Sequence, residues 1–123
     1  MIGLGIDLCT VSRMEKILTE HPRFAERYFT SAERGYLENR GAGRYQSAAA
    51  LMAAKEAFLK ALGLGLDGGI ALREIGVVHL PGGAPEYVPT GEALKRMEES
   101  GARRAFLSLT HEGDTAAAVC ILE

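Results

Sequence analysis

Residues 44–62 are the stretch that most restricts how this chain can fold. They are rich in alanine, methionine and leucine, which favour helix, and Gly63 follows as a helix C-terminal signal. We therefore expect one long helix. Two adjacent charges, Lys55 and Glu56, interrupt its apolar run. A buried or half-buried carboxylate needs a cation or a hydrogen-bond donor beside it, so the position of these charges requires an explanation.

Glu56 also has a simple local interpretation. Lys60 lies four residues after it, in the Glu-before-Lys order that stabilises an exposed helix face by a few tenths of a kcal/mol. On that interpretation the two residues form a solvated surface pair with no further role. The helix alone leaves both interpretations open.

The first residues of the chain predict a β-strand with two different faces. Large apolar residues stand at positions 2, 4, 6 and 8, and Gly3, Gly5 and Asp7 alternate with them. We expect the apolar face to be packed and the glycine face to be nearly bare. An aspartate on such a face is unfavourable unless it is solvated, caps the next helix or binds a ligand.

Capping and turn signals divide the rest of the chain. Capping-box patterns at Ser12–Glu15 and Thr30–Glu33 predict helices that begin near Arg13 and Thr30, and His21-Pro22 predicts a break between them. Strand-like segments cover residues 70–80, 86–88, 104–110 and 115–122. One further helix, capped by Thr90, covers residues 90–100. Hairpin-joined strands with helices grouped apart indicate one α+β domain over residues 1–123, with a largely antiparallel sheet packed against the long helix.

Composition excludes several classes of function. The net charge is −2 and the isoelectric point about 5.9, which gives no general electrostatic basis for binding nucleic acid. The apolar N-terminus lacks a basic region and is too short to span a bilayer, so we expect no targeting or membrane segment. Cys9 and Cys120 lie in apolar, strand-like surroundings without CxxC spacing, which favours buried reduced thiols and a cytoplasmic location.

Asp7 and Glu56 together suggest a cation site. If the first strand packs beside the long helix, the two carboxylates can share one hard cation. Magnesium is bound by one or two carboxylates together with waters and substrate phosphates. Lys55, Lys60 and His111 are then the natural phosphate partners, although a surface lysine is usually only solvated and a histidine before a turn is often structural.

Four segments carry a likeness to a known family, and they run from one end of the chain to the other. The segments are "GIDLCTVSRMEKI", "RFAERYFTSAE", "AAKEAFLKALGLGL" and "SLTHEGDTAAAVCILE". They contain three motifs: G-I-D at the first strand, K-E-A-x-x-K-A-x-G on the long helix and S-x-T-H near the C-terminus. In these motifs, their order and their spacing, the chain resembles holo-acyl carrier protein synthase, the short bacterial type of phosphopantetheinyl transferase.

The resemblance implies a fold, a reaction and a metal. The reaction is transfer of 4′-phosphopantetheine from coenzyme A to a serine of apo-acyl carrier protein, which releases adenosine 3′,5′-bisphosphate and supports fatty acid biosynthesis. The family holds magnesium with the aspartate of G-I-D and the glutamate of K-E-A, which are Asp7 and Glu56 here. It commonly forms trimers whose active sites lie between subunits.

The same resemblance implies roles for other residues. Asp7, Glu56 and Lys60 are expected to be catalytic, and the general base is Glu56, a metal-bound water or Glu112. The residues expected to contact coenzyme A are Lys55, Lys60, Gly63, Gly65, Ser108, Thr110 and His111. The acidic carrier protein is expected on a basic, partly apolar surface formed by Arg13, Ile17, Arg23, Phe24 and Arg27. The acidic neighbours Glu15, Glu20 and Glu26 also allow a merely solvated helix.

The chain departs from the family pattern before A-A-K-E-A. Many members have an arginine and an aromatic residue there, whereas this chain has Leu51 and Met52, so Arg44 or another cation must replace that charge if it aids binding. Two rival functions remain. One is a coenzyme A or nucleotide-binding module without catalysis, and the other is a small structural or interaction domain.

Overall fold

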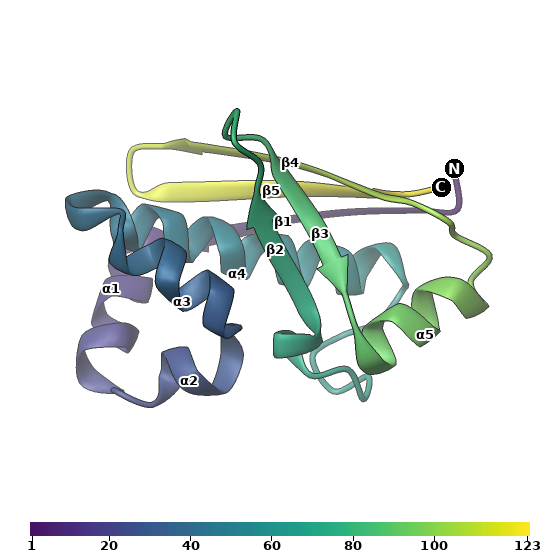
Figure 1. Ribbon diagram of the computed structural model, residues 1–123, viewed down its shortest axis with the longest axis horizontal. Coiled ribbons are helices and arrows are strands. Elements are labelled where there is room, and N and C mark those ends of the chain that lie inside the picture. The colour runs from purple at the N-terminus through teal and green to yellow at the C-terminus, as the bar shows by residue number, and fades with distance from the viewer.

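The computed structural model describes residues 1–123 as one α+β unit, shown in Figure 1. None of its helices combines the length and the hydrophobicity that a membrane-spanning segment needs. The elements, in chain order, are β1 (Gly3–Thr10), α1 (Val11–Glu20), α2 (Phe24–Tyr28), α3 (Ser31–Glu38), η1 (Gly41–Gly43), α4 (Arg44–Ala61), η2 (Leu72–Glu74), β2 (Ile75–His79), β3 (Pro85–Pro89), α5 (Gly91–Glu99), β4 (Ala105–Glu112) and β5 (Thr115–Leu122).

The strands form two antiparallel sheets, as the hairpin signals predicted. The larger sheet has three strands in the order β1-β5-β4, and the smaller one pairs β2 with β3. The long helix α4 lies along the three-stranded sheet, while α1, α2 and α3 gather at one end of the molecule and α5 lies at the other (Figure 1). A two-residue turn joins β4 to β5, so His111 and Glu112 belong to the strand and not to the loop.

The packed face of β1 is opposite to the one expected from its apolar pattern. Leu4, Ile6 and Leu8 are 56–63% exposed, while Gly5 and Cys9 are buried. The cause is the close approach of α4, because a Cβ atom on Gly5 would lie 1.9 Å from the carbonyl oxygen of Ala57. Only a glycine leaves room for the helix there, so the small side chains of β1 face inward and the large ones face outward.

Helix α1 is capped by a distant residue. It begins at Val11, two residues earlier than expected, and the capping box at Ser12 does not form. Instead, Asp114 in the β4–β5 turn accepts a hydrogen bond from the Ser12 backbone N–H at 2.9 Å and one from its hydroxyl. Helix α1 is therefore attached to the hairpin whose first strand carries His111.

Helix α5 also takes its cap from another element. Thr90 makes no capping hydrogen bond through its side chain, contrary to the sequence expectation. The carboxylate of Glu74 accepts from the backbone N–H of Glu92 at 2.7 Å and fills this role from η2.

Helix α4 is buried almost throughout its length, which explains its apolar run. Its buried side chains join those of β5, β2 and β3 in one core, which contains both free cysteines, as the sequence predicted. The outer face of the three-stranded sheet, by contrast, is open. Apolar side chains with large exposed fractions stand on it, namely Leu4, Ile6, Leu8 and Phe106.

Candidate active site

Asp7 and Glu56 meet at the free edge of β1, beside Lys60. The Lys60 ammonium lies 2.8 Å from Asp7 Oδ1 and donates to the Ile6 carbonyl at 3.2 Å. The Asp7 side chain is 12% exposed and that of Lys60 is 54% exposed, so the group opens to solvent on the lysine side. The two carboxylates that the sequence suggested for a shared cation are therefore neighbours within one chain.

The electrostatics of this group favour an additional positive charge. Burial, followed by the hydrogen bond and the negative charge of Asp7, raises the pKa of Glu56 to about 7, against the opposing charges of Lys60 and Arg13. Asp7 Oδ2 is buried and has no hydrogen-bond partner. Lys60 thus satisfies only one of the oxygens, and a small divalent cation between the carboxylates would satisfy the rest.

A stability measurement tests this description of Glu56. Its pKa in the folded chain lies above the unfolded value of 4.5, at about 7. The stability that the protonated form provides is therefore complete below pH 4.5 and is lost as the pH rises through about 7. Without metal, Glu56→Gln should raise the melting temperature at pH 8 by about 2–5 °C more than at pH 5.

The control for this measurement is Glu98→Gln on the exposed side of α5, which should show no such pH dependence. Equal effects of Glu56→Gln at both pH values would refute the raised pKa. Added magnesium should raise the melting temperature of the wild type more than that of Glu56→Gln, because one ligand is lost.

An apolar groove begins at Glu56 and runs between α1, α2 and the segment before β2. Its volume is about 670 Å³, and Arg13, Ile17 and Phe24 line it together with Glu56. We call it the docking groove. Three of the residues expected to receive the carrier protein therefore lie beside the acid pair. The other two, Arg23 and Arg27, lie in neighbouring hollows and are exposed.

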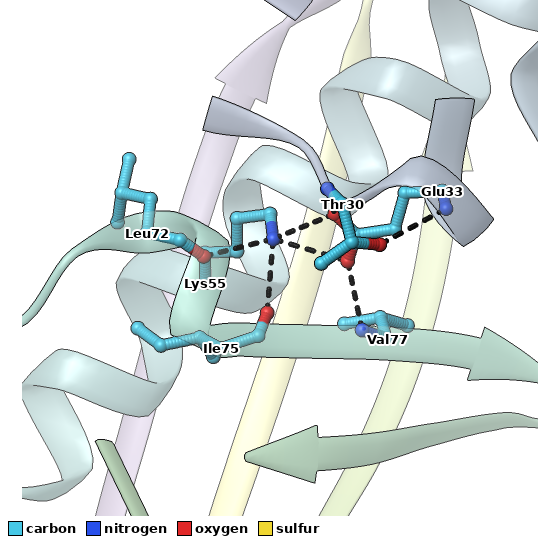
Figure 2. Close-up of polar contacts among 6 residues, drawn as sticks. All are labelled: Thr30, Glu33, Lys55, Leu72, Ile75 and Val77. Atoms are coloured by element: carbon cyan, nitrogen blue, oxygen red, sulfur yellow. Dashed lines mark hydrogen bonds and ion pairs between the residues drawn. The ribbon is translucent and has the colours of Figure 1, made fainter. Parts of the chain in front are cut away.

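Lys55 is not available to a ligand, which corrects the sequence expectation that it binds a coenzyme A phosphate. Its side chain is 0% exposed, and its ammonium lies 2.8 Å from Glu33 Oε1. It also donates to the carbonyl oxygens of Leu72 and Ile75 at 3.0 and 2.9 Å (Figure 2). All three donors are occupied, so the charge connects α4 to α3, η2 and β2.

Glu33 is the matching residue that sequence reasoning used only as part of a capping box. That box forms as predicted, since Thr30 Oγ1 accepts from the Glu33 N–H and Glu33 Oε1 accepts from the Thr30 N–H. The Glu33 carboxylate also accepts from the Val77 N–H at 2.8 Å (Figure 2). Its place in the capping box was the only signal in the sequence, and that signal does not indicate burial.

His111, Ser108 and Thr110 lie away from the acid pair. They stand on β4, which is separated from β1 by β5. Ser108 and Thr110 share the outer face with the exposed apolar residues, because both alternate with the inward Leu109. One chain alone does not bring these residues to Asp7 and Glu56.

A polar cleft of about 220 Å³ adjoins His111, and it contains residues that the sequence did not single out. Tyr36 stacks on His79 with ring centroids 4.0 Å apart, and Arg40 lies over the Tyr36 ring. Burial, followed by the charge of Arg40, lowers the pKa of His79. Arg40 donates to Ser47 at the cleft and is a cation beside it, whereas Leu51 is apolar and buried.

The two glycines after α4 occupy different environments. Gly63 has a φ of +76°, a left-handed conformation that ends the helix, and open space surrounds the position of a Cβ there. At Gly65 a Cβ would lie 3.2 Å from Asp67 Oδ1. Both glycines are on the loop that follows Lys60, so nucleotide binding by this loop stays a prediction.

The fold and the site together define a class of protein: a small antiparallel α+β domain in which two neighbouring carboxylates and a lysine lie next to an apolar groove. The model of the 4′-phosphopantetheinyl transferase superfamily matches residues 3–120. The chain belongs to this superfamily.

Individual relatives agree with this assignment. The chain is similar to a holo-[acyl-carrier-protein] synthase of Treponema denticola, with 46% identity over 100% of this chain and 98% of that protein. A second relative of the same name, from Gluconobacter oxydans, is 47% identical over 87% of this chain and 71% of its own length.

Solved structures agree as well. The crystal structure of holo-[acyl-carrier-protein] synthase from Neisseria meningitidis has a TM-score of 0.88 and 35% identity, covering 100% of this chain and 98% of that one. The Helicobacter pylori enzyme in complex with coenzyme A has a TM-score of 0.84 and 26% identity, covering 98% of this chain and 99% of that one.

Proposed function

We propose that this protein transfers 4′-phosphopantetheine from coenzyme A to a serine of apo-acyl carrier protein. The products are holo-acyl carrier protein and adenosine 3′,5′-bisphosphate, and the reaction serves fatty acid biosynthesis in the cytoplasm. The observation that carries the proposal is the meeting of Asp7, Glu56 and Lys60 beside the docking groove. The names of the relatives and the coenzyme A complex of a structural neighbour support the same reaction.

Asp7 and Glu56 would hold a magnesium ion. The buried, unpartnered Asp7 Oδ2 and the raised pKa of Glu56 fit a cation at this place. When bound, the ion neutralises charge on the diphosphate of coenzyme A and helps to orient it. Lys60, half-exposed and paired with Asp7, would neutralise the negative charge that develops on the departing bisphosphate.

Proton removal from the attacking serine is assigned to Glu56, directly or through a water that it holds. Glu56 lines the docking groove, so a serine hydroxyl of a protein bound there could come within reach of its carboxylate. The alternative base, Glu112, is on β4, beyond β5 from this edge of the sheet. A carrier protein bound in the docking groove would lie on the Glu56 side.

The site is completed, in this proposal, by another copy of the chain. Ser108, Thr110 and His111 are separated from Asp7 within one copy, and the outer face of their sheet is apolar and open. Large exposed apolar surfaces mark interaction sites. Packing of this face against another copy would bury it and bring β4 of one copy toward the acid pair of the next. The family resemblance favours three copies.

Charge placed on this face should prevent assembly. Ile6→Asp, at a side chain 63% exposed, should shift the mass measured by light scattering from that of an oligomer to that of one chain. Activity should fall with it, while the melting curve stays cooperative. Leu80→Asp, at an exposed apolar residue away from β1, is the matched control. An unchanged oligomer in the Ile6 variant would exclude this face as the interface.

The reaction itself is tested by incubating the protein with apo-acyl carrier protein, coenzyme A and magnesium, and weighing the carrier protein by mass spectrometry. We expect a gain of the phosphopantetheine mass, which chelation of the metal should abolish. Binding of coenzyme A without any gain would favour the non-catalytic binding module. If the protein neither binds coenzyme A nor transfers the group, the result would favour a structural domain.

A further inference from the structure

Helix α1 follows strand β1 without a loop, and this junction connects two parts of the candidate active site. Strand β1 ends at Thr10 and α1 begins at Val11. Asp7 stands near the end of the strand. Arg13, on the first turn of the helix, lines the docking groove together with Glu56. The direction in which α1 leaves β1 therefore determines where Arg13 lies relative to the acid pair.

Little within α1 itself holds its first turn. Thr10, the residue at the N-cap, makes no hydrogen bond through its side chain, and the first turn contains no acidic residue. Met14 is the only buried residue of the helix. Helix ends fray, and an N-terminus without a cap leaves backbone N–H groups unsatisfied. The first turn of α1 therefore depends on a group from another element.

Asp114, in the turn between β4 and β5, supplies that group. Its carbonyl oxygen accepts a hydrogen bond from the Val11 N–H at 2.8 Å. Its carboxylate accepts from both the backbone N–H and the hydroxyl of Ser12. The helix dipole also favours a negative charge at this end of a helix. Main chain and side chain of Asp114 thus hold α1 at its start.

The three-stranded sheet places Asp114 at this position. Thr115, the first residue of β5, pairs with Thr10, the last residue of β1, so Asp114 lies directly beside the start of α1. Gly113, with a φ of +57°, permits the tight turn from β4. Because β5 pairs with β1 along the whole strand, the sheet that carries Asp7 also fixes the cap of α1. The cap is therefore in place before any partner binds.

We propose that Asp114 is a positioning residue for the docking of the apo-acyl carrier protein: it fixes the start of α1 and thereby holds Arg13 and Ile17 in the wall of the docking groove. This inference rests on the proposed function. Asp114 is exposed and does not line the docking groove, so its effect passes through α1. Without the cap, only a fraction of the molecules would present the complete groove, and the apparent affinity would fall by that fraction.

The test is the affinity of labelled apo-acyl carrier protein, measured by fluorescence anisotropy without turnover. Asp114→Ala should raise the dissociation constant about fivefold, the factor that corresponds to the loss of one typical helix cap. Asp114→Asn should stay near the wild-type value, because its amide oxygen can still accept from the Ser12 N–H. In steady-state kinetics, Asp114→Ala should raise the KM for the carrier protein and leave turnover at saturating carrier protein and the KM for coenzyme A unchanged.

Met97→Ala is the control for a general loss of stability. It removes a buried side chain of α5, at the other end of the molecule from α1 (Figure 1). It should lower the melting temperature at least as much as Asp114→Ala does, and it should leave the carrier affinity unchanged. An equal loss of affinity in Met97→Ala would overturn the inference, since the effect would then follow stability and not the position of α1.

Ser12→Ala provides a second, milder variant, because it removes only the hydroxyl hydrogen bond to Asp114. It should raise the dissociation constant by a smaller factor and have no further effect in the Asp114→Ala background. Wild-type affinity in Asp114→Ala, or an equal loss in Asp114→Asn, would overturn the inference. A wild type that binds the carrier protein but transfers nothing would refute the proposed function alone.

Discussion

Asp7→Asn should lower the rate of phosphopantetheine transfer by at least about a hundredfold, the order of loss seen when one charge-stabilising group is removed from an active site. The substitution keeps the shape of the side chain but removes the negative charge that Glu56 and Lys60 both contact. The pKa of Glu56 should fall toward its ordinary value, and magnesium should bind more weakly. Mass spectrometry of the carrier protein and calorimetric titration of the metal measure the two effects.

Glu98→Gln on α5 is the control for this experiment, because it makes the same carboxylate-to-amide change at an exposed position. It should leave both transfer and metal binding unchanged. Full activity of Asp7→Asn at low magnesium would remove the acid pair from the mechanism. If the variant binds magnesium normally but transfers slowly, Asp7 would act by positioning Lys60 and would not be a metal ligand.

Lys55→Met should destabilise the fold by about 3–5 kcal/mol, the range measured when one partner of a buried ion pair is removed. The substitution leaves the fully buried Glu33 carboxylate without its cation, and it removes the donor to Leu72 and Ile75. Burial lowers the pKa of Lys55, and Glu33 opposes that effect, so each charge depends on the other. Chemical denaturation gives the free energy of unfolding.

The double variant Lys55→Met with Glu33→Gln should recover part of this loss, because no uncompensated charge then stays buried. Lys95→Met, at an exposed position, should change stability little. Strict additivity of the two single substitutions would show that the buried residues do not act as a pair.

The sequence predicted the elements that depend on local signals. The long helix, the Thr30–Glu33 capping box and the hairpins all form, because propensity and turn chemistry act over a few residues. The proximity of Asp7 and Glu56 was also predicted correctly. The prediction depended on the condition that the first strand packs beside the long helix, and the family resemblance implied the same pair of residues.

Features that depend on distant partners were missed or reversed. Alternation in β1 indicates two faces, but not which one a helix will cover, and the glycines decide that question only once α4 is in place. Lys55 was noticed as an anomaly, yet its partner Glu33 is separated from it by 22 positions and carries no pairing signal. The α1 cap from Asp114, at a separation of 102, is equally invisible in the sequence.

The contact of β1 with α4 also has a consequence for protein engineering. At Gly3 and Gly5 main chain meets main chain, so the spacing between strand and helix does not depend on the size of any core side chain. Asp7 and Glu56 project from these two backbones. The core side chains can therefore be replaced widely without changing the distance between Asp7 and Glu56, provided that both glycines are retained.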